Sequence, residues 1–240
     1  MNYEALTNYI SSTPLTWLII TIAAFKFGII IYEKFNKHTL LQPIIIAYVI
    51  ILTLIVYTNT SFEKYFKSVE IIHFFLGPAT VALALPLYKN LKYIKSLFLP
   101  IVLTLFIAGV FSIVIAVSLL YIFGAHLPTI LSMTTKSITA PIAIITSEQI
   151  GAIPSLAVGF VLITGIVGAL FGTIVFKIFK VKYETSKGFA LGLVSHGIGT
   201  ARAIEISEKA AAFAALAMGL SGIFTAIFLP IVITYFKNIF

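Results

Sequence analysis

The sequence contains no cysteine, and only 10% of its 240 residues are charged. The absence of cysteine excludes disulfides, thiolate chemistry and zinc–thiolate sites. The four histidines are scattered without metal-ligand spacing, so we expect no metal and no other cofactor. The sequence also lacks a phosphate-binding loop, a nucleophile elbow, a metal-binding helix and a dinucleotide fingerprint, so we do not expect an enzyme.

Hydrophobic residues make up 60% of the chain, and the mean hydropathy of +1.10 is beyond that of ordinary soluble domains. Two stretches, 129–148 and 187–207, are apolar but interrupted by polar residues, Gly and Pro. Continuous apolar runs exclude a β-barrel, so the sequence predicts an all-α polytopic membrane protein with one transmembrane domain over residues 1–240. The continuous runs, each near the length of one bilayer crossing or somewhat shorter, are 15–32, 43–57, 71–88, 97–123, 155–179 and 210–236.

The basic residues lie mostly in loops between these runs, so the formal charge of +8 reports topology and not a nucleic-acid partner. The N-terminus has no basic n-region, and we expect no cleavable signal peptide. If the N-terminus is outside and 129–148 is a re-entrant hairpin, ten lysines face the cytoplasm while Lys209 faces outward. A broken helix that crosses the membrane would also fit the length of 129–148. The ten lysines are Lys34, Lys37, Lys89, Lys92, Lys95, Lys177, Lys180, Lys182, Lys187 and Lys237.

This count predicts about seven transmembrane helices plus a re-entrant hairpin. The protein would be multi-pass in the cell membrane, with the N-terminus outside and the C-terminus cytoplasmic. Residues 73–88 and 195–207 each contain a glycine break followed by a threonine, Thr80 and Thr200. We therefore predict inverted repeats with two broken helices, the halves being 15–123 and 129–237. A chance similarity between two helices broken by Gly or Pro is the alternative.

The first polar cluster is MTTKSITAPIA at residues 133–143. Pro141 lacks an amide proton and disfavours helix at Ala140, so the chain is expected to unwind here. Lys136 beside hydroxyls and free amides would form an anion cradle, flanked by Thr135, Ser137 and Thr139. Alternatively, Lys136 extends from a shallow loop to the lipid headgroups.

The second cluster is SHGIGTARAIE at residues 195–205. Gly197 and Gly199 permit a sharp bend, after which Thr200 would stand near the start of a new half-helix. Arg202 carries a fork suited to binding a carboxylate, but Glu205 follows three residues later on the same helical face. Arg202 therefore meets either a substrate or Glu205. His196 either carries a proton or bonds across a helix interface.

Three motifs together resemble those of the LrgB/CidB family of bacterial membrane proteins: GPATVALALPLYKNL at 77–91, TTKSITAPIA at 134–143 and SHGIGTARAIE at 195–205. The resemblance implies holin-like or antiholin-like modulation of murein hydrolase export and cell lysis with a small LrgA/CidA partner. It also implies small-carboxylate transport, because related proteins include a chloroplast glycolate/glycerate translocator with fused LrgA-like and LrgB-like parts, and bacterial pairs are implicated in pyruvate uptake. The LrgA-like half is expected to be a separate protein. The residues carried over are Lys136, Ser137, Thr139, Pro141, His196, Gly197, Gly199, Thr200, Arg202 and Glu205.

Cationic groups beside broken helices favour a carrier for a small monocarboxylate, such as pyruvate or glycolate, that works by alternating access. A holin-like pore, or a regulator whose partner does the work, is the alternative. The expected partners are the carboxylate, the LrgA/CidA-like protein, the lipid bilayer and a second copy in a homodimer, since two-fold assemblies are the commonest. The predicted substrate-binding residues are Thr80, Thr135, Lys136, Ser137, Thr139, His196, Gly197, Gly199, Thr200, Arg202 and Glu205.

Overall fold

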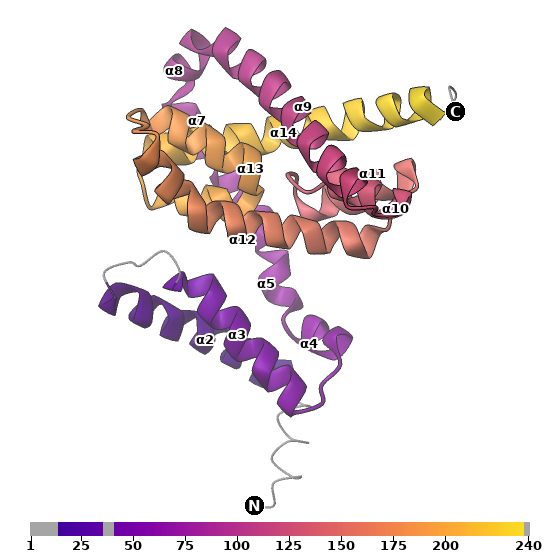
Figure 1. Ribbon diagram of the computed structural model, residues 1–240. Coiled ribbons are helices and arrows are strands. Elements are labelled where there is room, and N and C mark those ends of the chain that lie inside the picture. The colour runs from indigo at the N-terminus through magenta and orange to yellow at the C-terminus, as the bar shows by residue number, and fades with distance from the viewer. Residues whose placement is uncertain (1–13, 36–40, 238–240) are drawn as a thin grey trace, which may run out of the picture. The chain divides into compact units, whose positions relative to one another are not determined.

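The computed structural model describes residues 14–35 and 41–237, and over these ranges the chain is all helical, with no strand (Figure 1). A shorter apolar helix, Pro43–Tyr57, accompanies the long ones. These lengths and compositions are those of a multi-pass membrane protein. In the described ranges, five segments are long and apolar enough to cross a membrane: Leu15–Lys34, Glu70–Lys89, Phe98–Ile122, Pro154–Ile178 and Glu208–Tyr235.

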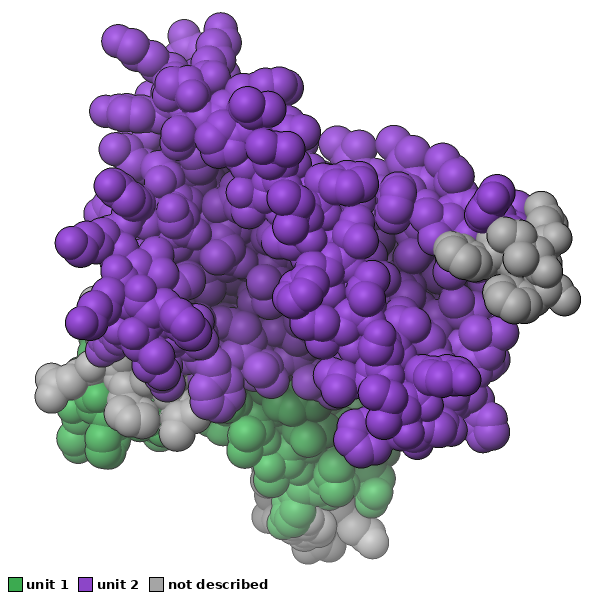
Figure 2. All heavy atoms as spheres, turned by 45° about the horizontal axis from the view of Figure 1, so that its top comes forward, with its two compact units in different colours: residues 1–82 green, residues 83–240 purple. Residues whose placement is uncertain are grey.

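The chain divides into two compact units, residues 1–82 and 83–240 (Figure 2). The predicted repeat halves, 15–123 and 129–237, do not follow this division and stay a prediction. Among the residues of the sequence predictions, Lys37 lies outside the described ranges, and the side chains of Thr80 and Lys237 are not among those described. The helices of the first unit are α2 (Pro14–Lys34), α3 (Pro43–Tyr57), α4 (Phe62–Ser68), α5 (Glu70–Phe74) and α6 (Leu76–Ala82).

In the first unit, α2 packs on α3 and α4. Trp17 is fully buried and meets the ring of Tyr65 edge-on, with centroids 5.5 Å apart. The Thr21 hydroxyl lies 3.2 Å from the Tyr65 hydroxyl. A Cβ added to Gly28 would lie 2.7 Å from the carbonyl oxygen of Pro43, so glycine lets α2 approach the start of α3.

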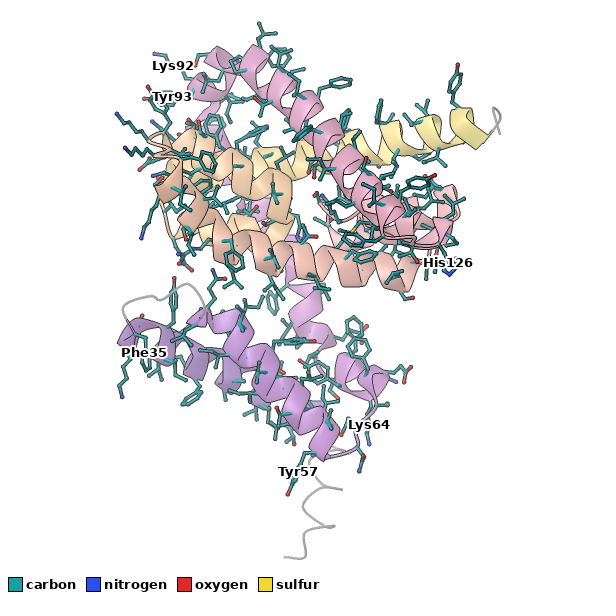
Figure 3. All side chains as sticks on the ribbon, viewed as in Figure 1. Phe35, Tyr57, Lys64, Lys92, Tyr93 and His126 are labelled. Carbon is teal, nitrogen blue, oxygen red and sulfur yellow. The ribbon has the colours of Figure 1, made fainter. Side chains whose placement is uncertain are left out.

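The second unit is built on three long helices, α9, α12 and α14, and it has two distinct ends. Figure 3 shows Lys92 and Tyr93 at one end, where α9 begins, and His126 at the other, just after α9 ends. We call these the lysine end and the far end. The helices of this unit are α7 (Ala84–Lys89), α8 (Leu91–Ser96), α9 (Phe98–Ile122), α10 (Leu127–Thr134), α11 (Ala140–Ile150), α12 (Pro154–Ile178), α13 (Glu184–Ile204) and α14 (Glu208–Lys237).

Helices α10 and α11 form a first hairpin at the far end. At 1.5 Å per residue they are roughly 12 Å and 16 Å long, too short to cross a hydrocarbon core of about 30 Å. The hydroxyl of Ser132 in α10 accepts a 2.9 Å hydrogen bond from the amide of Ile153, just before α12. Leu131 and Ile150 share one buried cluster. The end of α11 therefore returns to the level of α10.

Helix α13 is a second hairpin, which differs from the single span predicted over residues 187–207. The backbone of His196 has φ 42° and ψ −124°, which interrupts the helix. In a straight helix, Gly199 would stand about 12 Å along the axis from Leu191. Instead, a Cβ added to Gly199 would lie 2.1 Å from the Leu191 carbonyl oxygen. The arm 197–204 therefore folds back on the arm 184–195.

The start of α14 lies beside α7 and α8, the short helices that carry Lys89, Lys92 and Lys95. Glu208 forms a 2.9 Å ion pair with Lys89, and the ammonium of Lys209 lies 4.1 Å from the ring centre of Tyr93. The charge count instead placed Lys209 on the opposite side of the membrane from these lysines. In the structure, the fold-back at His196 returns the chain to the same end of the unit as Lys89 and Tyr93.

Glycines bring the helices around the second hairpin into backbone contact. A Cβ added to Gly188 or Gly192 would lie 2.1 Å or 2.0 Å from the carbonyl oxygen of Ala210 or Ala214, respectively. On the other side, an added Cβ at Gly168 of α12 would lie 1.9 Å from the Ser195 hydroxyl. Such small-residue contacts are the usual basis of close helix packing in membranes.

Candidate functional site

The first hairpin bends at residues 135–139, where the chain leaves the helix before Pro141 as the sequence predicts. The ammonium of Lys136 donates hydrogen bonds to the hydroxyl of Ser112 in α9 at 2.6 Å and to that of Ser137 at 3.1 Å. Lys136 is half-buried within the fold and does not extend from a loop tip toward headgroups. The bend thus holds a cation against the middle of α9.

Ser112 and Ser137 both line a small cavity of about 60 Å³. The cavity lies near the midpoints of α9 and α14, between the bend of the first hairpin and the first arm of the second. Five hydroxyl-bearing residues contribute to its wall: Ser112, Thr134, Ser137, Ser221 and Thr225. The remainder of the wall is apolar, so the cavity combines hydroxyl groups with one neighbouring cation.

The second hairpin bends at His196, one residue before the glycines that the sequence singled out. His196 has a positive φ, a conformation that other L-residues rarely adopt and that glycine adopts readily. The imidazole Nε2 of His196 donates to the carbonyl oxygen of Val161 at 3.0 Å, and the Thr200 hydroxyl donates to the carbonyl oxygen of His196 at 2.8 Å. The first bond holds the bend against α12, and the second lies within α13.

Both bends reach the same part of α12. Ile138, from the first bend, packs in a buried cluster with Val161, whose carbonyl oxygen receives the bond from His196. A Cβ added to Gly165, one turn further along α12, would lie 2.8 Å from the His196 ring. Two bends that enter from opposite ends of the unit therefore meet near its middle.

The sequence matches the LrgB-like family over residues 21–235. The chain belongs to the LrgB-like family. The family assignment agrees with the resemblance carried by the three sequence motifs. No solved structure matches the chain.

Named relatives of this LrgB-like protein match most of its length. Antiholin-like protein LrgB from Bacillus mycoides (strain KBAB4) is 30% identical over 218 residues, which cover 91% of this chain and 95% of that protein. Proteins of the same name from Bacillus cereus (strain B4264) and Bacillus anthracis (strain CDC 684 / NRRL 3495) are 29% identical over the same shares.

In this LrgB-like protein, Arg202 pairs with Glu205. The Arg202 guanidinium donates to the Glu205 carboxylate within the second arm of α13, three residues away along the helix. Arg202 is mostly buried, whereas Glu205 is 40% exposed. This pair is one of the two alternatives that the sequence allowed for Arg202, and a bond from Arg202 to a substrate stays a prediction.

Apart from Thr80, which stands in α6 of the first unit, the other predicted site residues are divided between the two bends. The Thr135 hydroxyl donates to the Ser132 carbonyl oxygen at 2.9 Å, and Thr139 precedes the first turn of α11. Gly197 is exposed, and Gly199 lies at the contact between the two arms of α13. Of the predicted residues, Ser137 lines the cavity and Lys136 bonds to its wall.

Sequence reasoning missed three hydroxyl-bearing wall residues, and it left Thr134 of the first polar cluster out of the predicted site. The three missed residues stand in helices, and the wall forms only when α9, α10 and α14 come together. The available signal for them was a hydroxyl near the middle of a long apolar run, which is weak because such groups can bond to their own helix. They are Ser112, Ser221 and Thr225.

A second concentration of positive charge lies at the lysine end. A cavity of about 560 Å³ there is lined by four lysines together with Phe176 and Ile206. The lysines stand at the end of α12 and the start of α13, and they raise the local concentration of anions. They are Lys177, Lys180, Lys182 and Lys187.

The bend at His196 predicts an inverted order of stability for two substitutions. His196→Gly and His196→Ala both remove the bond to Val161, but only glycine relieves the positive φ. We expect His196→Gly to be the more stable variant by about 1–2 kcal/mol, whereas inside a straight helix alanine is favoured by about 1 kcal/mol. The fraction of purified protein that stays monodisperse after heating measures the difference. A more stable alanine variant would contradict the fold-back.

The Arg202–Glu205 pair predicts coupling between two substitutions. We expect Arg202→Gln or Glu205→Gln alone to lower stability by about 1 kcal/mol, and the double variant to lose less than the sum of the two. A double-mutant cycle of thermal stability measures this coupling. Additive losses would show that the two side chains act separately.

Proposed function

We propose that this protein is a membrane carrier for a small monocarboxylate and that the carboxylate binds in the hydroxyl-lined cavity beside Lys136. The position of the Lys136 ammonium, 2.6 Å from the Ser112 hydroxyl, carries the proposal. A charged group at membrane depth is costly and usually serves a substrate or ion. A carboxylate in this cavity would accept charge-assisted hydrogen bonds from Lys136 and neutral ones from the serines.

The cavity favours a small substrate with one negative charge. A volume of about 60 Å³ matches a molecule with only a few heavy atoms. Lys136 is the cation that bonds to the wall, while Arg202 is engaged with Glu205. A second carboxylate would need a second cation, so pyruvate, glycolate and close relatives fit better than dicarboxylates. The hydroxyls can bond to the keto or hydroxyl oxygen of such acids.

The two hairpins support alternating access by an inverted repeat. We propose that α9 with the first hairpin and α12 with the second hairpin are the repeated units, in place of the halves 15–123 and 129–237. The hairpins enter from opposite ends and meet at Val161, as expected for a site between inverted repeats. Their broken backbone is protected because it lies against protein.

This arrangement implies a topology with the lysine end in the cytoplasm. Helix α14 begins at the lysine end, and its later residues Leu229 and Ile233 pack with Ile150 at the far end. The C-terminus would then lie outside, and not in the cytoplasm as the charge count predicts. We keep the N-terminus outside and place the protein in the cell membrane.

The names of the relatives favour a second candidate function. Antiholin-like proteins named LrgB suggest a regulator of lysis that acts with an LrgA/CidA-type partner, as a pore component or as its inhibitor. A homodimer is compatible with either function. A pore formed by assembly has no evident use for a lysine fixed at the first bend, which is why we place the carrier first.

Uptake into proteoliposomes separates these functions. The carrier predicts saturable uptake of labelled pyruvate and glycolate by the purified protein, with no release of a trapped dye. Release of the dye together with unsaturable pyruvate entry would support the pore. The absence of both, with and without an LrgA/CidA-type partner in the same vesicles, would support a regulator and contradict the carrier.

A further inference from the structure

Building on the proposed function, we propose that the substrate site communicates with the lysine end through a chamber beside α9, and that Phe189 and Leu193 form an apolar gate between the two. The chamber is a second cavity, distinct from the one beside Lys136, with a volume of about 390 Å³. It would receive the carboxylate before the gate opens.

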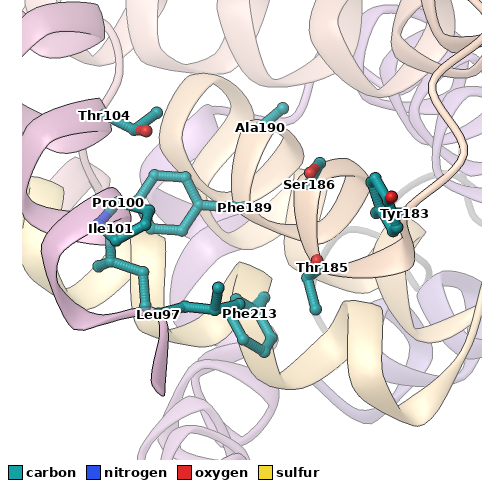
Figure 4. A pocket seen from close by; sticks show the side chains of 10 residues that line it. All are labelled: Leu97, Pro100, Ile101, Thr104, Tyr183, Thr185, Ser186, Phe189, Ala190 and Phe213. Carbon is teal, nitrogen blue, oxygen red and sulfur yellow. The ribbon is translucent and has the colours of Figure 1, made fainter. Parts of the chain in front are cut away.

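Figure 4 shows the chamber between the start of α9, the first arm of α13 and the start of α14. All three helices begin at the lysine end, so the chamber lies at that end of the unit. Its wall is largely apolar but includes the hydroxyl groups of Thr104, Tyr183, Thr185 and Ser186. Such a wall can hold an anion that remains partly hydrated.

The chamber and the inner cavity are stacked along the same helices. Ile101 lines the chamber and Leu105 lines the inner cavity, four residues along α9. On α13, Phe189 lines the chamber and Leu193, four residues later, lines the inner cavity. Residues four apart lie one above the other on a helix face, so the two cavities are about one turn apart.

A single buried cluster fills the space between them. Its large members on α9 and α13 are each less than a tenth exposed, and Phe213 from α14 is 2% exposed. An anion cannot pass such a layer without losing its water, so an apolar layer closes a path to ions until its side chains separate. The full cluster is Ile101, Leu105, Phe189, Leu193, Phe213 and Ala217.

The packing indicates where this layer can open. The first arm of α13 is held to α14 by backbone contacts at Gly188 and Gly192. Helix α9 instead meets this pair through side chains, including the ring contacts of Phe106 with Phe224 and Phe228. Side-chain layers can rearrange more readily than contacting backbones. The gate therefore opens by separation of α9 from the α13–α14 pair.

The absence of cysteine allows a direct test with single reporter thiols. Thr104→Cys places a thiol in the chamber, and Thr225→Cys places one in the inner cavity. In purified protein, we expect a charged maleimide to label Thr104→Cys quickly and Thr225→Cys slowly. Adding Phe189→Ala and Leu193→Ala should speed the labelling of Thr225→Cys at least about tenfold, equivalent to ~1.4 kcal/mol less protection.

Two further variants make the result decisive. Leu105→Ala opens the layer from the α9 side and should also speed labelling, without changing the second hairpin. Phe111→Ala removes a similar apolar side chain from the exposed face of α9 and should leave labelling unchanged. Slow labelling of Thr225→Cys in both gate variants, each monodisperse, would overturn the gate, as would equally fast labelling of both reporters before any gate change.

This test does not depend on transport. If vesicles take up no pyruvate but labelling follows the gate variants, the path exists and the proposed substrate is wrong. If pyruvate uptake is saturable but labelling ignores the gate variants, the carrier stands and the gate is wrong.

Discussion

Replacing Lys136 with methionine is expected to lower the kcat/KM of pyruvate uptake by about 100-fold or more. Removing one partner of a buried charged pair costs about 3 kcal/mol or more, because the carboxylate then loses its counter-charge inside the fold. Methionine keeps most of the length of the side chain while losing the bonds to Ser112 and Ser137. Initial rates of labelled pyruvate uptake into proteoliposomes measure the change.

Lys26→Met is the matched control, because Lys26 is an exposed lysine within the apolar helix α2. We expect its uptake to equal that of the wild type. Ser112→Ala should fall between the two, with a loss of about tenfold, since it removes a neutral partner and keeps the charge. Normal uptake by monodisperse Lys136→Met protein would exclude Lys136 as the substrate cation.

Replacing Gly192 with valine is expected to prevent formation of the second hairpin. Even the Cβ of the new side chain would lie 2.0 Å from the Ala214 carbonyl oxygen. The position of each atom is fixed by the backbone, so no change of rotamer can relieve the clash. The expected loss is about 3 kcal/mol or more, at the upper end for overpacked cores. Yield and monodispersity after mild heating measure it.

Gly159→Ala is the control for this substitution, because a Cβ at Gly159 in α12 meets nothing within 4 Å. Alanine is favoured over glycine inside helices by about 1 kcal/mol, so this variant should match or exceed the wild type in stability. Equal behaviour of the two glycine variants would contradict the close packing of α13 on α14.

The first bend and Lys136 could be predicted from local sequence. Pro141 disfavours helix at the preceding residue whatever surrounds it, and a lysine between hydroxyl-bearing residues is conspicuous in an apolar chain. The partner of that lysine could not be predicted. Ser112 stands 24 residues earlier in a long apolar run, and only the packing of α9 on the first hairpin brings the two together.

The second bend could not be predicted from the length of its segment. Residues 187–207 are long enough for one crossing, and the glycines that predict a break do not reveal its angle. The fold-back depends on a positive φ at His196, held by Val161 from a different helix. Because the charge count assumed a crossing there, it also misplaced Lys209.

The binding of pyruvate and of its neutral amide to the purified protein, measured by calorimetry, tests most directly whether Lys136 holds a small monocarboxylate. The two ligands have nearly the same size and keto group, but only pyruvate carries the charge that the Lys136 ammonium pairs with. We expect saturable binding of pyruvate to the wild type, weak or no binding of the amide, and loss of pyruvate binding in Lys136→Met protein. Equal binding of both ligands, or unchanged pyruvate binding by the Lys136→Met variant, would contradict this expectation.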